Sequence, residues 1–235
     1  MIHNSGGGLR RLLIPVGVLA VAAGIWFGVS RFDPGAETGS PVATMRAGTL
    51  LPQPKVLSPF TLTDQDARPF GLEDLKGCWT FVSIGFTACG GVCPTNMATY
   101  RAVNREIGTA GAEQAVNFLF ISVDPERDSP EQLREYMHRF DPRFLGVTGS
   151  HDQLQPLVRE LGLMYGRSEG AGDTMGYMVD HSASILLLDP QARLIAVFSW
   201  PHNSAALAAD FAVLHDRYYQ GPLDSFRRSG QAHIP

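Results

Sequence analysis

The chain has 235 residues, of which 44 % are hydrophobic and 18 % charged, so it is too apolar for a disordered protein and long enough for one principal domain. Its 19 basic and 23 acidic side chains give a net charge of −4, which lacks the positive excess that binding to a phosphate backbone requires. Three cysteines are too few for a disulfide framework. Composition therefore excludes a disordered chain and a disulfide scaffold, and it argues against a nucleic-acid partner.

The N-terminal region is expected to direct export of the domain that follows. Residues 12–29 form an uncharged apolar run, which as a helix would span about 27 Å, enough to cross a bilayer. Two arginines precede it, so we expect residues 1–11 in the cytoplasm and the rest outside, on the periplasmic side of the inner membrane. A cleavable signal peptide ending near Ala20–Ala22 and a buried helix are the rival interpretations. Anchor and signal peptide would both export the domain that follows.

A linker and a tail are expected to flank that domain. Four prolines and several glycines lie between residues 30 and 55 without a hydrophobic period, which predicts a Pro/Gly-rich tether. The globular domain is expected over residues 56–220, and residues 221–235 are expected to form a loose tail.

Strand and helix patterns alternate through the domain. The expected strands are a hairpin of 60–63 with a segment near 70, buried strands at 79–86 and 117–123, a short strand at 144–147, and a second hairpin of 184–188 with 194–200. The expected helices are 94–107, 130–140 with Ser129 as N-cap, 152–161 and 205–219. This order predicts an α/β fold with a thioredoxin-like mixed β-sheet sandwiched by helices, plus the added N-terminal hairpin and the transmembrane helix.

Cys89 and Cys93 stand in FTACGGVCP, between the first buried strand and a helix. If the helix begins near Cys89, both sulfurs lie toward one side of its first turn, where the helix dipole favours thiolates. Helical geometry separates their Cβ atoms by about 5–6 Å, more than the ~3.5–4.5 Å of a relaxed disulfide, so the spacing favours a metal. Gly90 and Gly91 leave room for a ligand or partner backbone. A structural disulfide or two buried cysteines remain the alternatives.

His181, in YMVDHS, is the best candidate for a third ligand. It stands just before the strand expected at 184–188, and in a thioredoxin-like sheet the loop that enters this strand lies beside the cysteine loop. Two thiolates and one imidazole make a soft, three-coordinate site that suits copper(I) and also holds copper(II). Structural zinc would require a fourth protein ligand, and none is obvious. The sequence therefore favours copper bound by Cys89, Cys93 and His181.

The remaining polar and thiol residues have simpler interpretations. Cys78 precedes the first buried strand, at the end far from the cysteine loop, and is expected to pack in the core. Asp124 follows the second buried strand, where it would hydrogen-bond near the site or serve the start of the next helix. Four scattered histidines are expected on the surface: His138, His151, His202 and His215.

At these motifs the chain resembles the Sco/SenC family. The matching pieces are the N-terminal span, FTACGGVCP, SVDPERDSPEQLREY, YMVDHS and ILLLDPQARL, within residues 56–219 for the soluble part. The resemblance implies a membrane-tethered thioredoxin fold that handles copper for cytochrome oxidase assembly, with copper bound by Cys89, Cys93 and His181. In one departure, Gly90 and Gly91 replace the usual Pro-Asp. The change removes an acidic group beside the thiolates, which bears on copper affinity, thiol redox potential and choice of partner.

Three functions follow. The first is a copper metallochaperone that delivers the ion to the copper-containing subunit of a respiratory cytochrome oxidase, an assembly factor more than an enzyme. The alternative is a thiol-disulfide oxidoreductase in which Cys89 and Cys93 act on that subunit or another exported protein, and His181 is dispensable. A peroxide-reactive enzyme, the weakest of the three, would require an activating arginine, and the FTACGGVCP loop has none.

Overall fold

The computed structural model describes residues 45–109, 116–169 and 177–220. The anchor predicted at 12–29, most of the predicted linker and the tail at 221–235 lie outside these residues. Among the helices of the described part, none has both the length and the apolar character needed to cross a bilayer.

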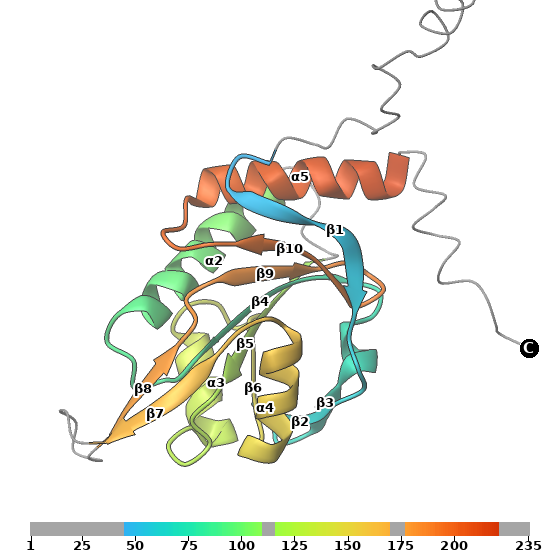
Figure 1. The fold of residues 1–235 in the computed structure, drawn as a ribbon. Coiled ribbons are helices and arrows are strands. Elements are labelled where there is room, and N and C mark those ends of the chain that lie inside the picture. The colour runs from blue at the N-terminus through green and yellow to red at the C-terminus, as the bar shows by residue number, and fades with distance from the viewer. Residues whose placement is uncertain (1–44, 110–115, 170–176, 221–235) are drawn as a thin grey trace, which may run out of the picture. The chain divides into compact units, whose positions relative to one another are not determined.

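The described chain forms an α/β fold around an eight-stranded mixed sheet (Figure 1). From one edge to the other, the strands are β1 (Gly48–Val56), β10 (Arg193–Phe198), β9 (Ile185–Leu188), β4 (Trp79–Gly85), β5 (Val116–Ser122), β6 (Leu145–Thr148), β2 (Thr61–Asp64) and β3 (Pro69–Gly71). β4, β5 and β6 are parallel, and β9 is antiparallel to β4. The predicted mixed sheet and both predicted hairpins, β2–β3 and β9–β10, are confirmed.

The central strands form because their apolar runs are buried on both faces. Successive side chains of a strand point to opposite faces, so Phe81 packs on one face while Val82 and Ile84 pack on the other. The first face is aromatic, with the rings of Phe81 and Phe118 stacked at a centroid distance of 5.3 Å. The sheet thus separates two hydrophobic cores.

Helices cover both faces. The helical elements are η1 (Leu72–Leu75), α2 (Val92–Thr109), α3 (Pro130–His138), α4 (His151–Glu160) and α5 (Ser204–Gln220). α2, α3 and α5 contribute to the aromatic core, whereas α4 and η1 pack on the opposite face. Ser129 caps α3 as predicted, because its hydroxyl accepts a hydrogen bond from the backbone N–H of Gln132 at 3.2 Å.

β1 differs from the expectation that the linker continues through residue 55. Residues 48–56 instead pair with β10 at the edge of the sheet. An edge strand tolerates prolines, and Pro52 and Pro54 lie where the register shifts between Leu50 and Lys55. The prolines that indicated a tether therefore occupy an irregular part of a strand, and the folded domain includes residues from Gly48 onward.

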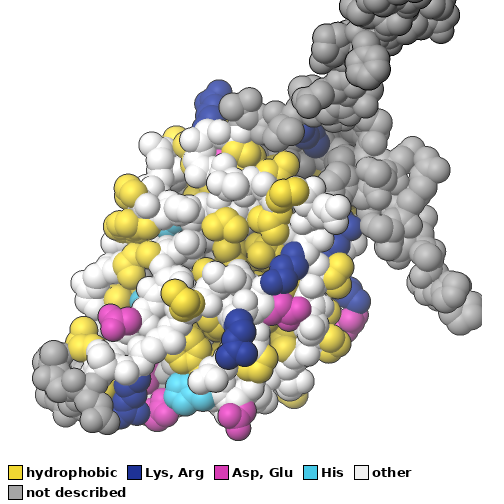
Figure 2. Space-filling model, in the orientation of Figure 1, with side chains coloured by type: hydrophobic (Ala, Val, Ile, Leu, Met, Phe, Trp, Pro, Cys, Tyr) yellow, Lys and Arg dark blue, Asp and Glu magenta, His cyan; other side chains and the backbone are white. Residues whose placement is uncertain are grey.

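An apolar groove of about 140 Å³ lies where β1, β10 and α5 meet. Leu50, Pro52, Ile195 and Leu214 are among the residues that line it. Figure 2 shows hydrophobic side chains gathered on this face of the molecule. Trp79 at the start of β4 also lines the groove, so the groove lies at the opposite end of that strand from the cysteine loop.

Besides β1, the structure has a two-stranded sheet that the sequence patterns did not predict. β7 (Tyr165–Glu169) pairs antiparallel with β8 (Tyr177–His181), so that Tyr165 lies opposite His181. Both strands are short and mix polar with apolar residues, and their pairing gives only a weak signal in sequence. This hairpin matters because its last residue is the predicted third ligand.

The start of β1 is fixed by one buried carboxylate. Asp210 of α5 is 2 % exposed and accepts hydrogen bonds from the backbone N–H groups of Arg46, Ala47 and Gly48 at 2.6, 2.8 and 2.9 Å. Replacement by alanine would leave three donors without their acceptor. We expect Asp210→Ala to lower the free energy of unfolding by about 1–3 kcal/mol, measured by urea denaturation. Asp216→Ala, at an exposed position of the same helix, is the control, and an equal effect of both substitutions would contradict this account.

Candidate metal centre

The cysteine loop follows the buried end of β4. The backbone N–H of Cys89 donates to the carbonyl of Phe86 at 3.2 Å, and α2 begins only at Val92. Cys93 therefore lies in the first turn of the helix and is 1 % exposed, whereas Cys89 precedes the helix and is half-buried. This corrects the expectation that both cysteines share the first helical turn.

Gly85, the last residue of β4, leaves space for the Cys93 sulfur. A Cβ atom at this position would lie 2.5 Å from Cys93 Sγ and 2.8 Å from the Phe120 ring, closer than real Cβ contacts. A side chain here would displace the thiol. Gly90 and Gly91 differ, because a Cβ atom at either would meet nothing within 4 Å. The loop between the cysteines therefore has free space around it, whereas Cys93 Sγ is packed closely against the backbone of Gly85.

Asp128 fixes the start of the loop, a role that sequence analysis missed. Its buried carboxylate accepts hydrogen bonds from the backbone N–H and the hydroxyl of Thr87, at 2.8 and 2.6 Å, and from the hydroxyl of Ser122 at 2.6 Å. Burial raises the pKa of Asp128, and the hydrogen bonds from Ser122 and Thr87 oppose that rise. The available signal was a second aspartate after a buried strand, in SVDPERDSP.

Asp124 instead stabilises the hairpin that carries His181. Its carboxylate accepts a hydrogen bond from the hydroxyl of Tyr177, the first residue of β8, at 2.7 Å, and pairs with Arg127. The Arg127 guanidinium lies over the Tyr177 ring at 4.2 Å and the Phe86 ring at 5.1 Å. Asp124 therefore ties the start of β8, four residues before His181, to the β5–α3 connection.

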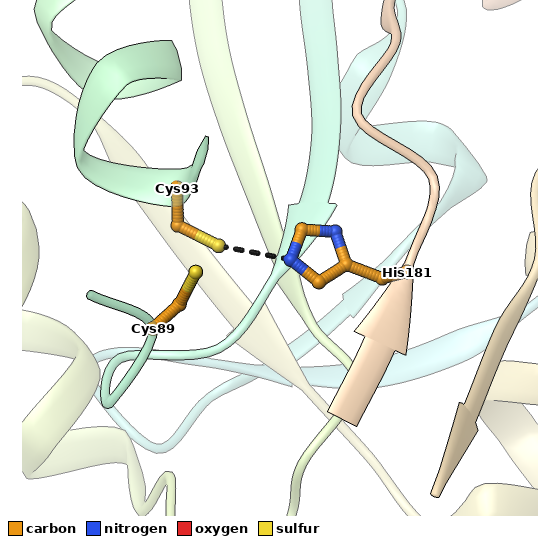
Figure 3. A group of neighbouring side chains, drawn as sticks. All are labelled: Cys89, Cys93 and His181. Carbon is orange, nitrogen blue, oxygen red and sulfur yellow. Dashed lines mark hydrogen bonds between the residues drawn. The ribbon is translucent and has the colours of Figure 1, made fainter. Parts of the chain in front are cut away.

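His181 ends β8 with its ring directed at the cysteines (Figure 3). Its Nε2 lies 3.1 Å from Cys93 Sγ, and its Nδ1 lies 3.0 Å from the carbonyl oxygen of Ser182. Because a carbonyl only accepts, Nδ1 donates this hydrogen bond, and Nε2 is the nitrogen that faces the sulfurs. Phe86 packs edge-on against the ring at 5.9 Å. A histidine held in this way, with its second nitrogen bonded to a carbonyl, has the arrangement typical of a metal ligand.

The structure brings together all three predicted site residues. One ligand atom from each of Cys89, Cys93 and His181 lies within 4.8 Å of the others, and the side chains converge on one point (Figure 3). Both sulfurs are free thiols, not joined in a disulfide. Three soft donors from two distant segments therefore meet at the end of β4.

The two cysteines share one proton unequally. A hydrogen bond from Cys93 lowers the pKa of Cys89 to about 3; burial opposes the change, and His181 and the backbone N–H groups of Cys93 and Gly91 favour it. The same hydrogen bond, together with burial, raises the pKa of Cys93. At neutral pH Cys89 is a thiolate and Cys93 is its donor, so the expectation that the helix start favours both thiolates is wrong for Cys93.

The other predicted positions differ in part from expectation. Cys78 is half-buried and belongs to neither hydrophobic core, which corrects its predicted role in core packing. His138 is exposed, and His151 is partly exposed and contacts Tyr165 and Glu126. His202 is not a simple surface residue: it is half-buried, burial lowers its pKa, and its Nε2 donates to the carbonyl of Ala183 at 3.0 Å.

Comparison with known proteins agrees with this geometry. The SCO1/SenC family model matches residues 49–215. The chain belongs to the SCO1/SenC family. A Stutzerimonas stutzeri protein, named as copper-binding, is 37 % identical over 146 residues, which cover 62 % of this chain and 70 % of that protein.

Two solved structures of Sco proteins show the same fold. Arabidopsis thaliana ScoI with copper bound is 31 % identical, with a TM-score of 0.62 over 69 % of this chain and 98 % of that chain. Bradyrhizobium japonicum ScoI with copper bound is 34 % identical, with a TM-score of 0.57 over 65 % of this chain and 95 % of that chain. The predicted thioredoxin-like Sco fold is therefore confirmed.

The unequal thiols predict how alkylation depends on pH. In the reduced, metal-free protein, Cys89 should react with iodoacetamide at a nearly constant rate from pH 8 down to about pH 4, and the rate should fall as pH approaches the lowered pKa of about 3. Mass spectrometry of the Cys89 peptide measures this rate. Cys93→Ala removes the main cause of the lowered pKa, so its rate should fall at a higher pH. A wild-type rate that falls tenfold per pH unit below pH 8 would contradict the assignment.

Proposed function

We propose that this protein is a copper metallochaperone that binds copper(I) through Cys89 Sγ, Cys93 Sγ and His181 Nε2. The convergence of these atoms within 4.8 Å carries the proposal. Thiolate and imidazole are ligands that copper(I) accepts, and two relatives were solved with copper bound. Among the described residues, no fourth His, Cys, Asp or Glu joins the cluster, whereas structural zinc sites usually have four protein ligands.

Binding requires one proton to leave. Cys89 is already a thiolate, while the thiol of Cys93 must lose its proton before its sulfur becomes a strong ligand. The positive charge of the ion compensates for the second thiolate in this buried place. His181 would bind through Nε2, the nitrogen that its Nδ1 hydrogen bond to Ser182 leaves facing the sulfurs. Copper uptake is therefore expected to release about one proton per ion at neutral pH.

The exposure of the ligands supports an order of exchange. Cys93 is buried and His181 is bonded to its own strand end, whereas Cys89 is half-buried beside the open Gly90–Gly91 segment. A ligand from a partner protein reaches the ion from the Cys89 side. The low pKa of Cys89 also makes its thiolate a good leaving group. In this proposal Cys89 leaves first and Cys93 and His181 release the ion last.

We further propose that the recipient is the copper site of a respiratory cytochrome oxidase subunit. Membership of the SCO1/SenC family supports this assignment. The apolar run at 12–29 would anchor the protein in the inner membrane, and the segment between residue 30 and β1 would tether the copper domain on the periplasmic side. Such a tether holds the domain near membrane-embedded recipients and raises the effective concentration of the two partners.

A thiol-disulfide oxidoreductase is the second candidate, favoured by the Cys89 thiolate beside the Cys93 thiol. Cys89 would attack a target disulfide, forming a mixed disulfide and releasing one target thiolate. Cys93, on losing its proton, would then attack Cys89 Sγ, releasing the second target thiolate and leaving a Cys89–Cys93 disulfide. The target gains two electrons and the cysteine pair loses two. His181 forms and breaks no bond in these steps, so the disulfide can form without it.

His181→Ala separates the two functions. Loss of one of three ligands should weaken copper(I) binding by more than the roughly 10- to 100-fold that losing an outer-shell partner costs, while Cys89 and Cys93 still form a disulfide. The measurement is an anaerobic titration of the reduced protein against a copper(I) chelator. His138→Ala, at an exposed position, is the matched control. Unchanged copper binding in His181→Ala would exclude the three-ligand site, and a wild-type protein that takes up no copper(I) would favour the oxidoreductase.

A further inference from the structure

The carbonyl oxygen of Ala183 joins three segments of the chain near the metal centre. It accepts one hydrogen bond from Asn96 Nδ2 at 3.2 Å and another from His202 Nε2 at 3.0 Å. Asn96 lies on α2, three residues after Cys93, and His202 lies between β10 and α5. Ala183 itself follows His181 by two residues. The helix that carries one ligand is thus bonded to the segment that carries another.

Both side chains are oriented by that carbonyl. Because a carbonyl only accepts, Asn96 turns its NH₂ group toward it and His202 turns an N–H toward it. This leaves Asn96 Oδ1 and His202 Nδ1 as acceptors, and neither has a hydrogen-bond partner among the described residues. Asn96 is 1 % exposed. An unsatisfied buried polar atom normally destabilises a fold, so an apolar residue at position 96 would be expected from stability alone.

The neighbouring contacts show what this bonding holds in place. Ser182 donates its backbone N–H to the carbonyl of Met164 at 2.9 Å, and its own carbonyl accepts from His181 Nδ1. Ser182 therefore sets the direction of the imidazole, and Ala183 is the next residue along the chain. At the other end of β8, Tyr177 is bonded to Asp124. The hairpin is thus held at both ends, and the Ala183 end is bonded directly to the cysteine helix.

We propose that Asn96 and His202 are positioning residues of the metal centre, which hold the Ala183 carbonyl so that His181 Nε2 stays against Cys93 Sγ. The expected effect on copper binding rests on the proposed copper function. The effect on the position of His181 concerns the metal-free protein and does not depend on that function. Holding two ligands in place reduces the ordering that copper binding must impose. Rigidity at Cys93 and His181 complements the open loop at Cys89, where exchange begins.

The test uses Asn96→Leu, which keeps the approximate size of the side chain and removes both its donor and its unsatisfied acceptor. Tyr100→Phe is the matched control, because it removes a buried hydrogen bond from the same helix, to Leu119 O at 3.4 Å, away from His181. His202→Leu removes the second donor and carries the test if Asn96→Leu does not fold. Each variant is made in the 235-residue chain and compared with the wild type.

The first readout is hydrogen exchange of the Ser182 amide in the reduced, metal-free protein. We expect exchange to be about tenfold faster in Asn96→Leu and in His202→Leu, and unchanged in Tyr100→Phe, with the thermal midpoint of Asn96→Leu equal to or above that of the wild type. Equal Ser182 exchange in all four proteins would overturn the proposal. So would faster exchange accompanied by an equal loss of global stability, which indicates a merely structural role.

The second readout is the affinity for copper(I) and the absorption spectrum of the copper(II) form. Asn96→Leu should bind copper(I) roughly three- to tenfold more weakly than wild type, and its copper(II) form should show a shifted sulfur-to-copper charge-transfer band. An unchanged affinity and band would contradict the positioning role. If the wild type binds no copper, the proposed function fails while the exchange result still decides whether Asn96 and His202 hold the His181 segment.

Discussion

The structure depends on the approach of His181 Nε2 to Cys93 Sγ, 3.1 Å apart although 88 residues separate them in sequence. Both atoms are fixed by the backbone. The sulfur lies over Gly85, where a Cβ atom would collide with it, and the imidazole is oriented by the carbonyl of Ser182. A cysteine pair that only formed a disulfide would not need a histidine oriented toward its sulfurs. The fold therefore supplies a nitrogen beside two sulfurs, which is the donor set of a soft cation.

The ligands divide into a fixed pair and a third ligand that is more accessible. Cys93 and His181 lie where β4, α2 and β8 meet, and buried polar groups, Asp128 and Asn96 among them, hold the surrounding segments. Cys89 precedes the helix, half-buried in a loop that has space around it. In the proposed metallochaperone function, the protein must retain its ion and also release it. Rigid ligands on one side and an accessible thiolate on the other serve both requirements.

Much of this architecture could be predicted from the sequence, because the central strands are continuous apolar runs and the helices begin at recognisable caps such as Ser129. The three site residues were predicted from spacing, donor chemistry and family resemblance. β1 was missed because Pro52 and Pro54 suggest a linker, although an edge strand accommodates them. β7 and β8 were missed because short strands of mixed polarity pair only through tertiary structure. No sequence pattern indicates the role of Asn96, because its hydrogen-bond partner is the backbone carbonyl of Ala183, far along the chain.

The most direct test of the account is X-ray absorption spectroscopy at the copper edge of the copper(I)-loaded protein. Bound copper should show two sulfur scatterers and one imidazole nitrogen, with the nitrogen contribution lost when His181 is replaced by alanine. A spectrum with sulfur donors alone in the wild type, or an imidazole signal that survives in that variant, would contradict a centre built from Cys89, Cys93 and His181.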